Sequence, residues 1–133
     1  MPKHMRPAGA YKLWLRAVQR REPMVIVTAR ACSARFMREL LQRALRLHAK
    51  APPVLPRRLS VISVNSQRCL QRYGARYPTA AARKCATLKA HMKAKGWQRV
   101  CFVDDDLRNL RAMRALGSHV ELRSGRTGRR AKA

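Results

Sequence analysis

The chain has 133 residues, of which 31 are Lys or Arg and only 6 are Asp or Glu, giving a formal net charge of +25. One domain is expected at this length, and a hydrophobic share of 47% excludes disorder throughout. A free protein with this charge would repel itself and attract polyanions, of which nucleic acid is the natural one. Aromatic residues make up 5%, which argues against a broad base-stacking platform. No apolar stretch reaches the length of a membrane span.

The first half of the chain begins with an irregular basic arm over residues 1–9. Helical spacing of apolar residues then predicts a helix over Ala10–Arg21. A compact apolar strand follows at Met24–Val27. Ser33 can cap a long amphipathic helix that runs to about His48.

After a Pro-rich loop, the run Leu59–Val64 predicts a second strand. Asn65–Pro78 is expected to be a polar connection without regular structure. The next helix covers Thr79–Lys95 and ends before Gly96, which is typical of a helix C-cap.

The remaining elements are a strand at Val100–Val103, a helix over Leu107–Leu116 and a short strand at His119–Leu122. Alternating strands and helices predict an α/β three-layer sandwich with a parallel sheet over residues 10–122. Arg123–Ala133 is expected to be an extended basic tail, ordered only where an anion holds it.

The four cysteines are isolated and show no zinc-site spacing, so we expect buried, reduced thiols in a reducing compartment. They are Cys32, Cys69, Cys85 and Cys101.

Half of the acidic residues stand side by side as Asp104, Asp105 and Asp106, directly after a predicted strand. Ligands and metals of open α/β sheets are held at the carboxyl ends of strands, and carboxylates are the oxygen ligands that Mg²⁺ prefers. The triad therefore predicts a cation site or its remnant. The alternative, which stays open, is a helix N-cap with additional acids.

Three segments together resemble the haloacid dehalogenase-like superfamily of phosphohydrolases: the strand ending at Thr28, the helix with Lys84, and the phrase F-V-D-D-x-x-x-N-L that contains Asp104, Asp105 and Asn109. The resemblance covers about residues 11–122. It implies an incomplete Rossmann-like domain in which Thr28, Lys84 and Asn109 are remnants of a phosphate site. It also implies that Asp104 and Asp105 form a vestigial Mg²⁺ site, with no other cofactor.

The sequence departs from that family at its first motif, a strand ending in Asp-x-Asp that supplies the nucleophile and the general acid. Residues 1–9 contain no acid, and only Glu22 and Glu39 precede Asp104. Without a nucleophilic carboxylate no aspartyl-phosphate can form, so we expect no enzymatic activity. The family's first strand is central. Its place is therefore either closed by pairing of Met24–Val27 with Val100–Val103 or filled by a strand from another chain.

These features favour a structural RNA-binding component of a large ribonucleoprotein, built on an inactive haloacid dehalogenase-like domain. Charge and basic extensions favour a ribosome, and a mitochondrial one over a cytoplasmic one, because the first 21 residues are basic and free of acids. The expected partners are ribosomal RNA and neighbouring ribosomal proteins, one of which could donate the central strand. The alternative is a split or metal-dependent phosphohydrolase whose nucleophile comes from another chain.

The cations expected to contact RNA lie in both terminal segments and along the second predicted helix: Lys3, Arg6, Arg35, Arg38, Arg43, Arg46, Arg123, Arg126, Arg129, Arg130 and Lys132.

Overall fold

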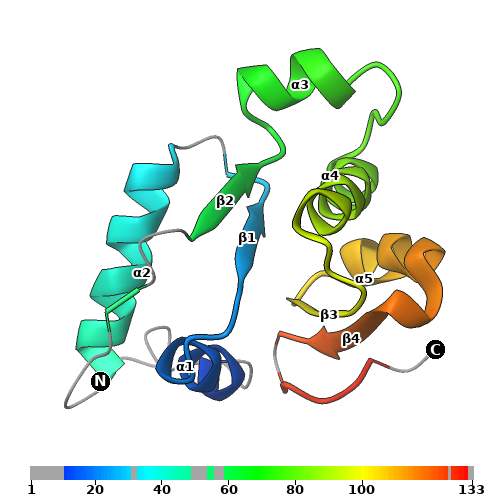
Figure 1. The fold of residues 1–133 in the computed structure, drawn as a ribbon. Coiled ribbons are helices and arrows are strands. Elements are labelled where there is room, and N and C mark those ends of the chain that lie inside the picture. The colour runs from blue at the N-terminus through cyan, green and yellow to red at the C-terminus, as the bar shows by residue number, and fades with distance from the viewer. Residues whose placement is uncertain (1–10, 31–32, 49–53, 56–58, 126, 132–133) are drawn as a thin grey trace.

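The structure is a computed structural model that describes residues 11–30, 33–48, 54–55, 59–125 and 127–131 (Figure 1). Helices and strands alternate along these ranges, which confirms the mixed α/β class. The elements are α1 (Tyr11–Gln19), β1 (Val25–Thr28), α2 (Ala34–His48), β2 (Ser60–Ser63), α3 (Gln67–Tyr73), α4 (Ala80–Lys95), β3 (Val100–Asp104), α5 (Leu107–Met113), the 3₁₀ helix η2 (Arg114–His119) and β4 (Val120–Ser124).

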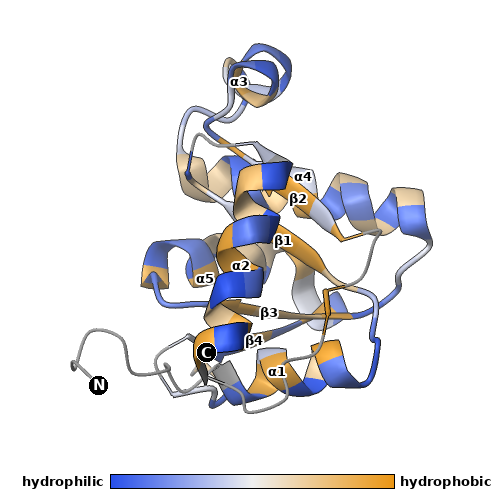
Figure 2. Ribbon diagram, turned by 90° about the vertical axis from the view of Figure 1, so that its left-hand side faces the viewer, coloured by the Kyte–Doolittle hydropathy of each residue, from blue (hydrophilic) through white to orange (hydrophobic). Residues whose placement is uncertain are grey.

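The four strands form two small parallel sheets instead of the single sheet expected from the sequence. β1 pairs with β2, with Val25 opposite Ser60, and β3 pairs with β4, with Val100 opposite Val120. β1 and β3 share no ladder, so their direct pairing does not occur. In two perpendicular views the strands nevertheless follow the order β2, β1, β3, β4 across the molecule (Figures 1 and 2).

Each sheet has its own apolar core, because the strands carry apolar runs and the helices amphipathic patterns (Figure 2). The first core lies between α1, α2 and the β1–β2 sheet and contains Val18 and Leu45. The second lies between α4, α5 and the β3–β4 sheet and contains Leu88 and Met113. Val25 of β1 packs against the second core, which joins the two sheets through apolar contact.

Caps mark the ends of α2 and α4, and those at Ser33 and Gly96 were predicted from the sequence. Ser33 Oγ accepts a hydrogen bond from the Phe36 amide at 3.1 Å, and Thr79 Oγ1 accepts one from the Ala82 amide at 3.1 Å. Gly96 ends α4 in the left-handed region with φ 69°, a conformation that favours glycine. None of the described helices is both long and apolar enough to cross a membrane.

Two segments differ from the prediction in local structure. The connection expected over Asn65–Pro78 contains α3, whose N-cap Ser66 accepts a hydrogen bond from the Cys69 amide at 3.2 Å. The helix expected to reach Leu116 changes at Arg114 to the 3₁₀ helix η2, and Gly117 then departs from helical geometry with φ 61°.

The extended tail predicted from Arg123 is wrong for the part of it that the structure describes. β4 continues to Ser124, and the chain then folds back, so that the Ala131 amide donates to the Leu122 carbonyl oxygen at 2.8 Å. Arg123 and Arg130 form an antiparallel bridge. A free strand edge carries main-chain groups that need partners, and here the following residues supply them. The predicted arm at residues 1–9 lies outside the described residues.

We expect Leu45→Ala to lower the free energy of unfolding by about 2–5 kcal/mol, because it leaves a cavity in the first core. Leu45 is 0% exposed, whereas Leu47 on the same helix is 59% exposed. The matched variant Leu47→Ala should therefore change stability by no more than about 0.5 kcal/mol. Denaturant unfolding measures both variants, and equal losses would contradict the placement of this core.

Candidate functional site

Asp104, at the carboxyl end of β3, is the centre of a buried polar cluster. Its Oδ2 accepts hydrogen bonds from Lys84 Nζ at 3.1 Å and from Asn109 Nδ2 at 2.9 Å. Its Oδ1 accepts one from the Asp106 amide at 2.8 Å. The side chains of Lys84 and Asp104 are only 9% and 10% exposed. The structure thus brings together three residues predicted from the sequence to form one site, and we call Lys84, Asp104 and Asn109 the Asp104 cluster.

The other two acids of the triad lie in different environments. Asp106 is the N-cap of α5 and accepts from the Arg108 amide at 2.9 Å. Hydrogen bonds from the Arg108 side chain and amide also lower the pKa of Asp106. Asp105 is exposed. The N-cap interpretation is therefore correct for Asp106, while Asp104 has a separate, buried role.

The cluster does not fit a metal site as it stands. Both oxygens of Asp104 already accept hydrogen bonds from the protein, and Lys84 places an ammonium where a cation would bind. Among the described residues, no group of three or more His, Cys, Asp or Glu could hold a metal ion. The Mg²⁺ site at Asp104 and Asp105 therefore stays a prediction.

The turn after β4 lies against the backbone of Asp104 and Asp105. The Gly125 amide donates to the Asp104 carbonyl oxygen at 2.7 Å. A Cβ at Gly125 would lie 2.9 Å from the Asp105 backbone nitrogen, closer than real contacts allow. This close approach, which sequence reasoning missed, requires glycine.

Sequence reasoning also missed Arg83, which is 6% exposed and binds the loop after β2 and the turn after α3. Its Nε donates to the Val64 carbonyl oxygen at 2.9 Å, and its Nη2 donates to Asn65 Oδ1 at 2.6 Å. Its Nη1 donates to the Tyr77 carbonyl oxygen at 3.0 Å. Asn65 Nδ2 in turn donates to the Ala29 carbonyl oxygen at 2.9 Å. The only feature of the sequence that could have pointed to Arg83 is its position beside Lys84 in an alanine-rich helix.

Thr28 ends β1 as predicted but does not bind the Asp104 cluster. Its Oγ1 accepts a hydrogen bond from the Arg30 amide at 3.1 Å, and its carbonyl oxygen accepts one from the Val64 amide at 2.9 Å. The hydroxyl group therefore shapes the turn that follows the strand.

The cations predicted to contact RNA occupy several environments. Arg35 is 91% exposed and lies 3.6 Å from Glu39, while Arg43 and Arg46 are exposed on α2 and Arg38 is half-buried. Lys3, Arg6, Arg126 and Lys132 lie outside the described residues.

In the folded-back tail, Arg123 and Arg130 bind Glu121 at 2.8 Å and 3.0 Å. The hydrogen bond from Arg130 lowers the pKa of Glu121. Arg129 is exposed. Two of the predicted RNA contacts are therefore partly neutralised by a carboxylate of the chain itself.

The described thiols are poorly suited to nucleophilic chemistry. Burial raises the pKa of Cys69 and Cys85, and partial desolvation together with the charge of Glu121 raises that of Cys101. The three thiols therefore stay protonated and unreactive at neutral pH. Cys69 is buried as predicted, but Cys101 is exposed. Cys32 lies outside the described residues.

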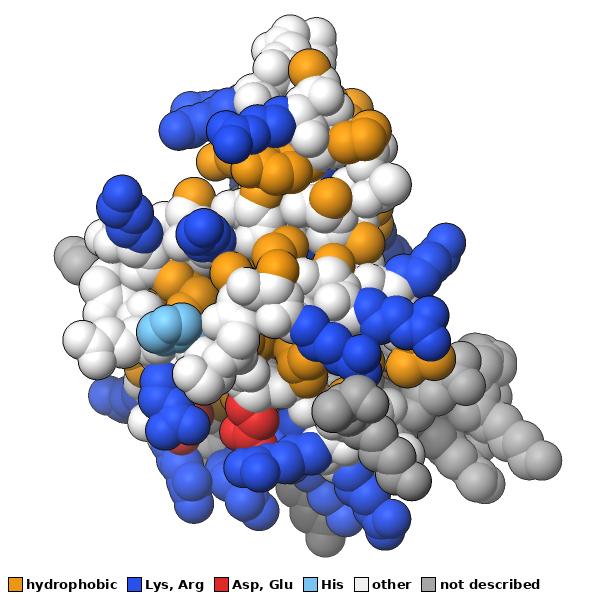
Figure 3. Space-filling view, turned by 90° about the vertical axis from the view of Figure 1, so that its right-hand side faces the viewer, with side chains coloured by type: hydrophobic (Ala, Val, Ile, Leu, Met, Phe, Trp, Pro, Cys, Tyr) orange, Lys and Arg blue, Asp and Glu red, His pale blue; other side chains and the backbone are white. Residues whose placement is uncertain are grey.

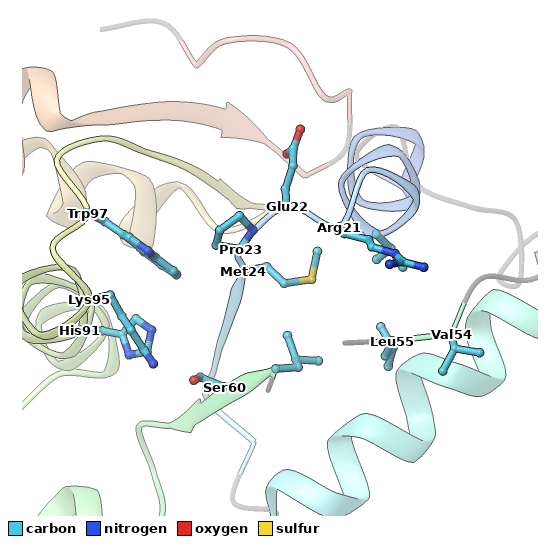
Figure 4. A pocket seen from close by; sticks show the side chains of 12 residues that line it. Arg21, Glu22, Pro23, Met24, Val54, Leu55, Ser60, His91, Lys95 and Trp97 are labelled. Carbon is cyan, nitrogen blue, oxygen red and sulfur yellow. The ribbon is translucent and has the colours of Figure 1, made fainter. Parts of the chain in front are cut away.

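A cavity of about 660 Å³ lies between α1, the beginnings of β1 and β2, and the last turns of α4. His91, Lys95 and Trp97 line one side, and Met24 and Leu55 lie across from them (Figure 4). The His91 and Trp97 rings pack edge to face with centroids 5.1 Å apart. His91 Nε2 is buried without a hydrogen-bond partner. Burial, followed by the charge of Lys95, lowers the pKa of His91.

Comparisons with models of protein families, with curated proteins and with solved structures found no match to this chain.

We expect Lys84→Met to lower the free energy of unfolding by about 3–5 kcal/mol, because it leaves a buried carboxylate without its counter-charge. The double variant Lys84→Met/Asp104→Asn should recover most of this loss, since neither partner then carries a charge. Arg108→Gln, which breaks an exposed ion pair, should have little effect. Denaturant unfolding of these three variants and the parent protein tests this, and a double variant no more stable than Lys84→Met would exclude a coupled pair.

The lowered pKa of His91 predicts a stability that depends on pH. The unfolded chain binds a proton near the ordinary value of 6.5, whereas the folded chain binds it only at lower pH. The free energy of unfolding should therefore fall as the pH drops below about 6.5, and level off below the folded pKa. His91→Gln should flatten this dependence in unfolding curves, with His119→Gln as the matched variant at an exposed histidine. The same slope in His91→Gln and the parent protein would contradict the prediction.

Proposed function

We propose that the chain is a structural RNA-binding component of a large ribonucleoprotein. The observation that carries this proposal is the excess of exposed cations over available carboxylates. Lys and Arg side chains are spread over the face in Figure 3 and gather in its lower part, where the few visible acidic side chains also lie. Such a surface binds phosphate backbones without regard to sequence.

The chain's own acids supply little compensation for this charge. Asp104 is committed to Lys84, and Glu121 to Arg123 and Arg130. No Asp or Glu occurs between Glu39 and Asp104. The exposed cations without a carboxylate partner among the described residues include Arg43, Arg46, Arg68, Arg72, Arg76, Lys89, Lys93, Lys95, Arg99 and Arg111.

These cations lie on α2, on α3 and along α4 and α5, so they do not form one basic face. This distribution suits a protein with RNA on several sides, as in a ribosome, better than one that reads a single site. Basic terminal segments and an acid-free start favour the mitochondrial ribosome over the cytoplasmic one.

We propose no catalytic role for the Asp104 cluster. Every acceptor atom of the Asp104 carboxylate is occupied by a donor from this chain, so the cluster acts as a connection between β3, α4 and α5. The alternative function is a phosphohydrolase whose nucleophile comes from another chain. The meeting of Lys84, Asp104 and Asn109 at a strand end supports the resemblance behind that alternative.

A strand from a neighbouring protein remains our proposal for the place between β1 and β3. The strand order in two views and the missing β1–β3 ladder support it. Addition of a strand would give main-chain partners to the two edges that β2 and β4 do not cover.

The proposed function predicts an RNA affinity that falls steeply with salt. Arg43→Gln/Arg46→Gln should weaken binding to single-stranded RNA. The slope of log Kd against log salt concentration should fall by about 0.7 for each phosphate contact that is lost. Arg108→Gln is the matched control, because Asp106 already pairs with this arginine. Fluorescence anisotropy across a salt series measures both variants.

An affinity that is independent of salt would contradict the proposal. Turnover of an activated phosphate ester with Mg²⁺, abolished by Asp104→Asn, would favour the phosphohydrolase instead.

A further inference from the structure

α3 projects from the body of the molecule between β2 and α4 (Figures 1 and 2). Its two ends are fixed, because Ser66 caps the helix and the Tyr77 carbonyl oxygen accepts a hydrogen bond from Arg83 at 3.0 Å. Its outer residues are nevertheless open, and Leu70 is 42% exposed. The segment is therefore held in place while its surface remains accessible.

Two of the chain's three tyrosines lie together at the end of α3. The Tyr73 and Tyr77 ring centroids are 6.2 Å apart, with the rings tilted by 41°. The Tyr77 amide donates to the Tyr73 carbonyl oxygen at 2.8 Å, which fixes the spacing of the two residues. Although aromatic residues are scarce in the chain, the fold gathers two of them at one place.

An arginine lies over each of these rings. The Arg72 guanidinium carbon is 5.5 Å from the Tyr73 centroid, and that of Arg76 is 5.6 Å from the Tyr77 centroid. Both arginines are exposed, so the outer side of each guanidinium is open to a further planar group. Arginine planes and aromatic rings are the surfaces on which unpaired bases stack.

The same surface is strongly positive. Arg68, Arg72 and Arg76 follow one another at helical spacing and are all exposed. None of them forms an ion pair with a described acid. Planar stacking groups interleaved with uncompensated charge are complementary to a nucleic acid strand whose bases are free.

We infer that α3 and the turn after it, the α3 surface, bind single-stranded RNA. Bases stack on Tyr73, Tyr77 and the arginines above them, and phosphates contact Arg68, Arg72 and Arg76. The inference rests on the proposed RNA-binding function. It adds the location of the binding site for an unpaired strand and the contacts that hold the strand there. A duplex hides the faces of its bases, so it can use only the charges of this surface.

The test measures the Kd of the full chain by fluorescence anisotropy for an oligouridine and for an RNA duplex of equal length. Tyr73→Leu/Tyr77→Leu should weaken binding to the single strand by about tenfold for each stacked base lost. Binding to the duplex and the salt dependence should change little. Tyr73→Phe/Tyr77→Phe keeps the rings and should bind like the parent protein. Far-ultraviolet circular dichroism and unfolding curves identify any variant that does not fold.

Arg43→Gln/Arg46→Gln on α2 separates this inference from the proposed function. If that variant weakens binding to both RNAs while the leucine variant binds the single strand normally, the proposed function stands and the α3 inference is overturned. If the parent protein binds neither RNA, the proposed function itself fails. Displacement of oligouridine from the α3 surface by an acidic peptide at equal concentration would also overturn the inference, since charge alone would then explain the surface.

Discussion

Two adjacent cations at the start of α4 connect the parts of this protein. Arg83 binds Val64 and Asn65 in the loop that follows β2, while Lys84 binds Asp104 at the end of β3. Because no ladder joins β1 to β3, these hydrogen bonds supplement the apolar contact of Val25 with the second core. Cations near a helix N-terminus oppose the helix dipole, and burial adds a desolvation cost. Lys84 offsets these costs with the Asp104 carboxylate, and Arg83 with three oxygen acceptors.

The partners of these two cations differ in kind, and this difference affects what the protein can bind. Lys84 has a carboxylate, so that pair is neutral, whereas Arg83 has three uncharged oxygen acceptors. One of the few acids of the chain is thereby used for internal structure. The connection between the sheets thus removes a negative charge from the surface and leaves the exterior to its cations.

Local patterns in the sequence predicted most of the elements. The apolar runs at β1 to β4 and the amphipathic pattern of α2 are properties of short segments, and Ser33 and Gly96 marked helix ends by their own chemistry. α3 was missed because Cys69 is its only buried residue. The apolar residues of this segment therefore show too weak a helical periodicity to predict a helix. The division of the predicted α/β domain into two sheets depends on pairing between distant strands, which no local pattern reveals.

The candidate site was predicted where side-chain types carry the signal, as with Lys84, Asp104 and Asn109. Arg83 could not be found in this way, because two of its acceptors are main-chain carbonyl oxygens that any residue provides. The folded-back tail was missed for the same reason, since its hydrogen bonds join backbone groups of Leu122 and Ala131. Composition suggested an extended polycation there, whereas Glu121 forms ion pairs with two of its arginines, Arg123 and Arg130.

The path of the chain through the two sheets bears on how the protein is made. The first core is built from α1, α2 and the β1–β2 sheet, and the second mainly from elements that start at α4, so the chain passes from one to the other once, through α3. Contacts that are local in sequence form quickly, and domains generally fold from the N-terminus during synthesis. The first half can therefore assemble on the translating ribosome before the second is complete. Arg83 and Lys84 are synthesised between the two halves. Arg83 can then bind Val64 and Asn65 of the earlier half, and Lys84 can bind Asp104 of the later half.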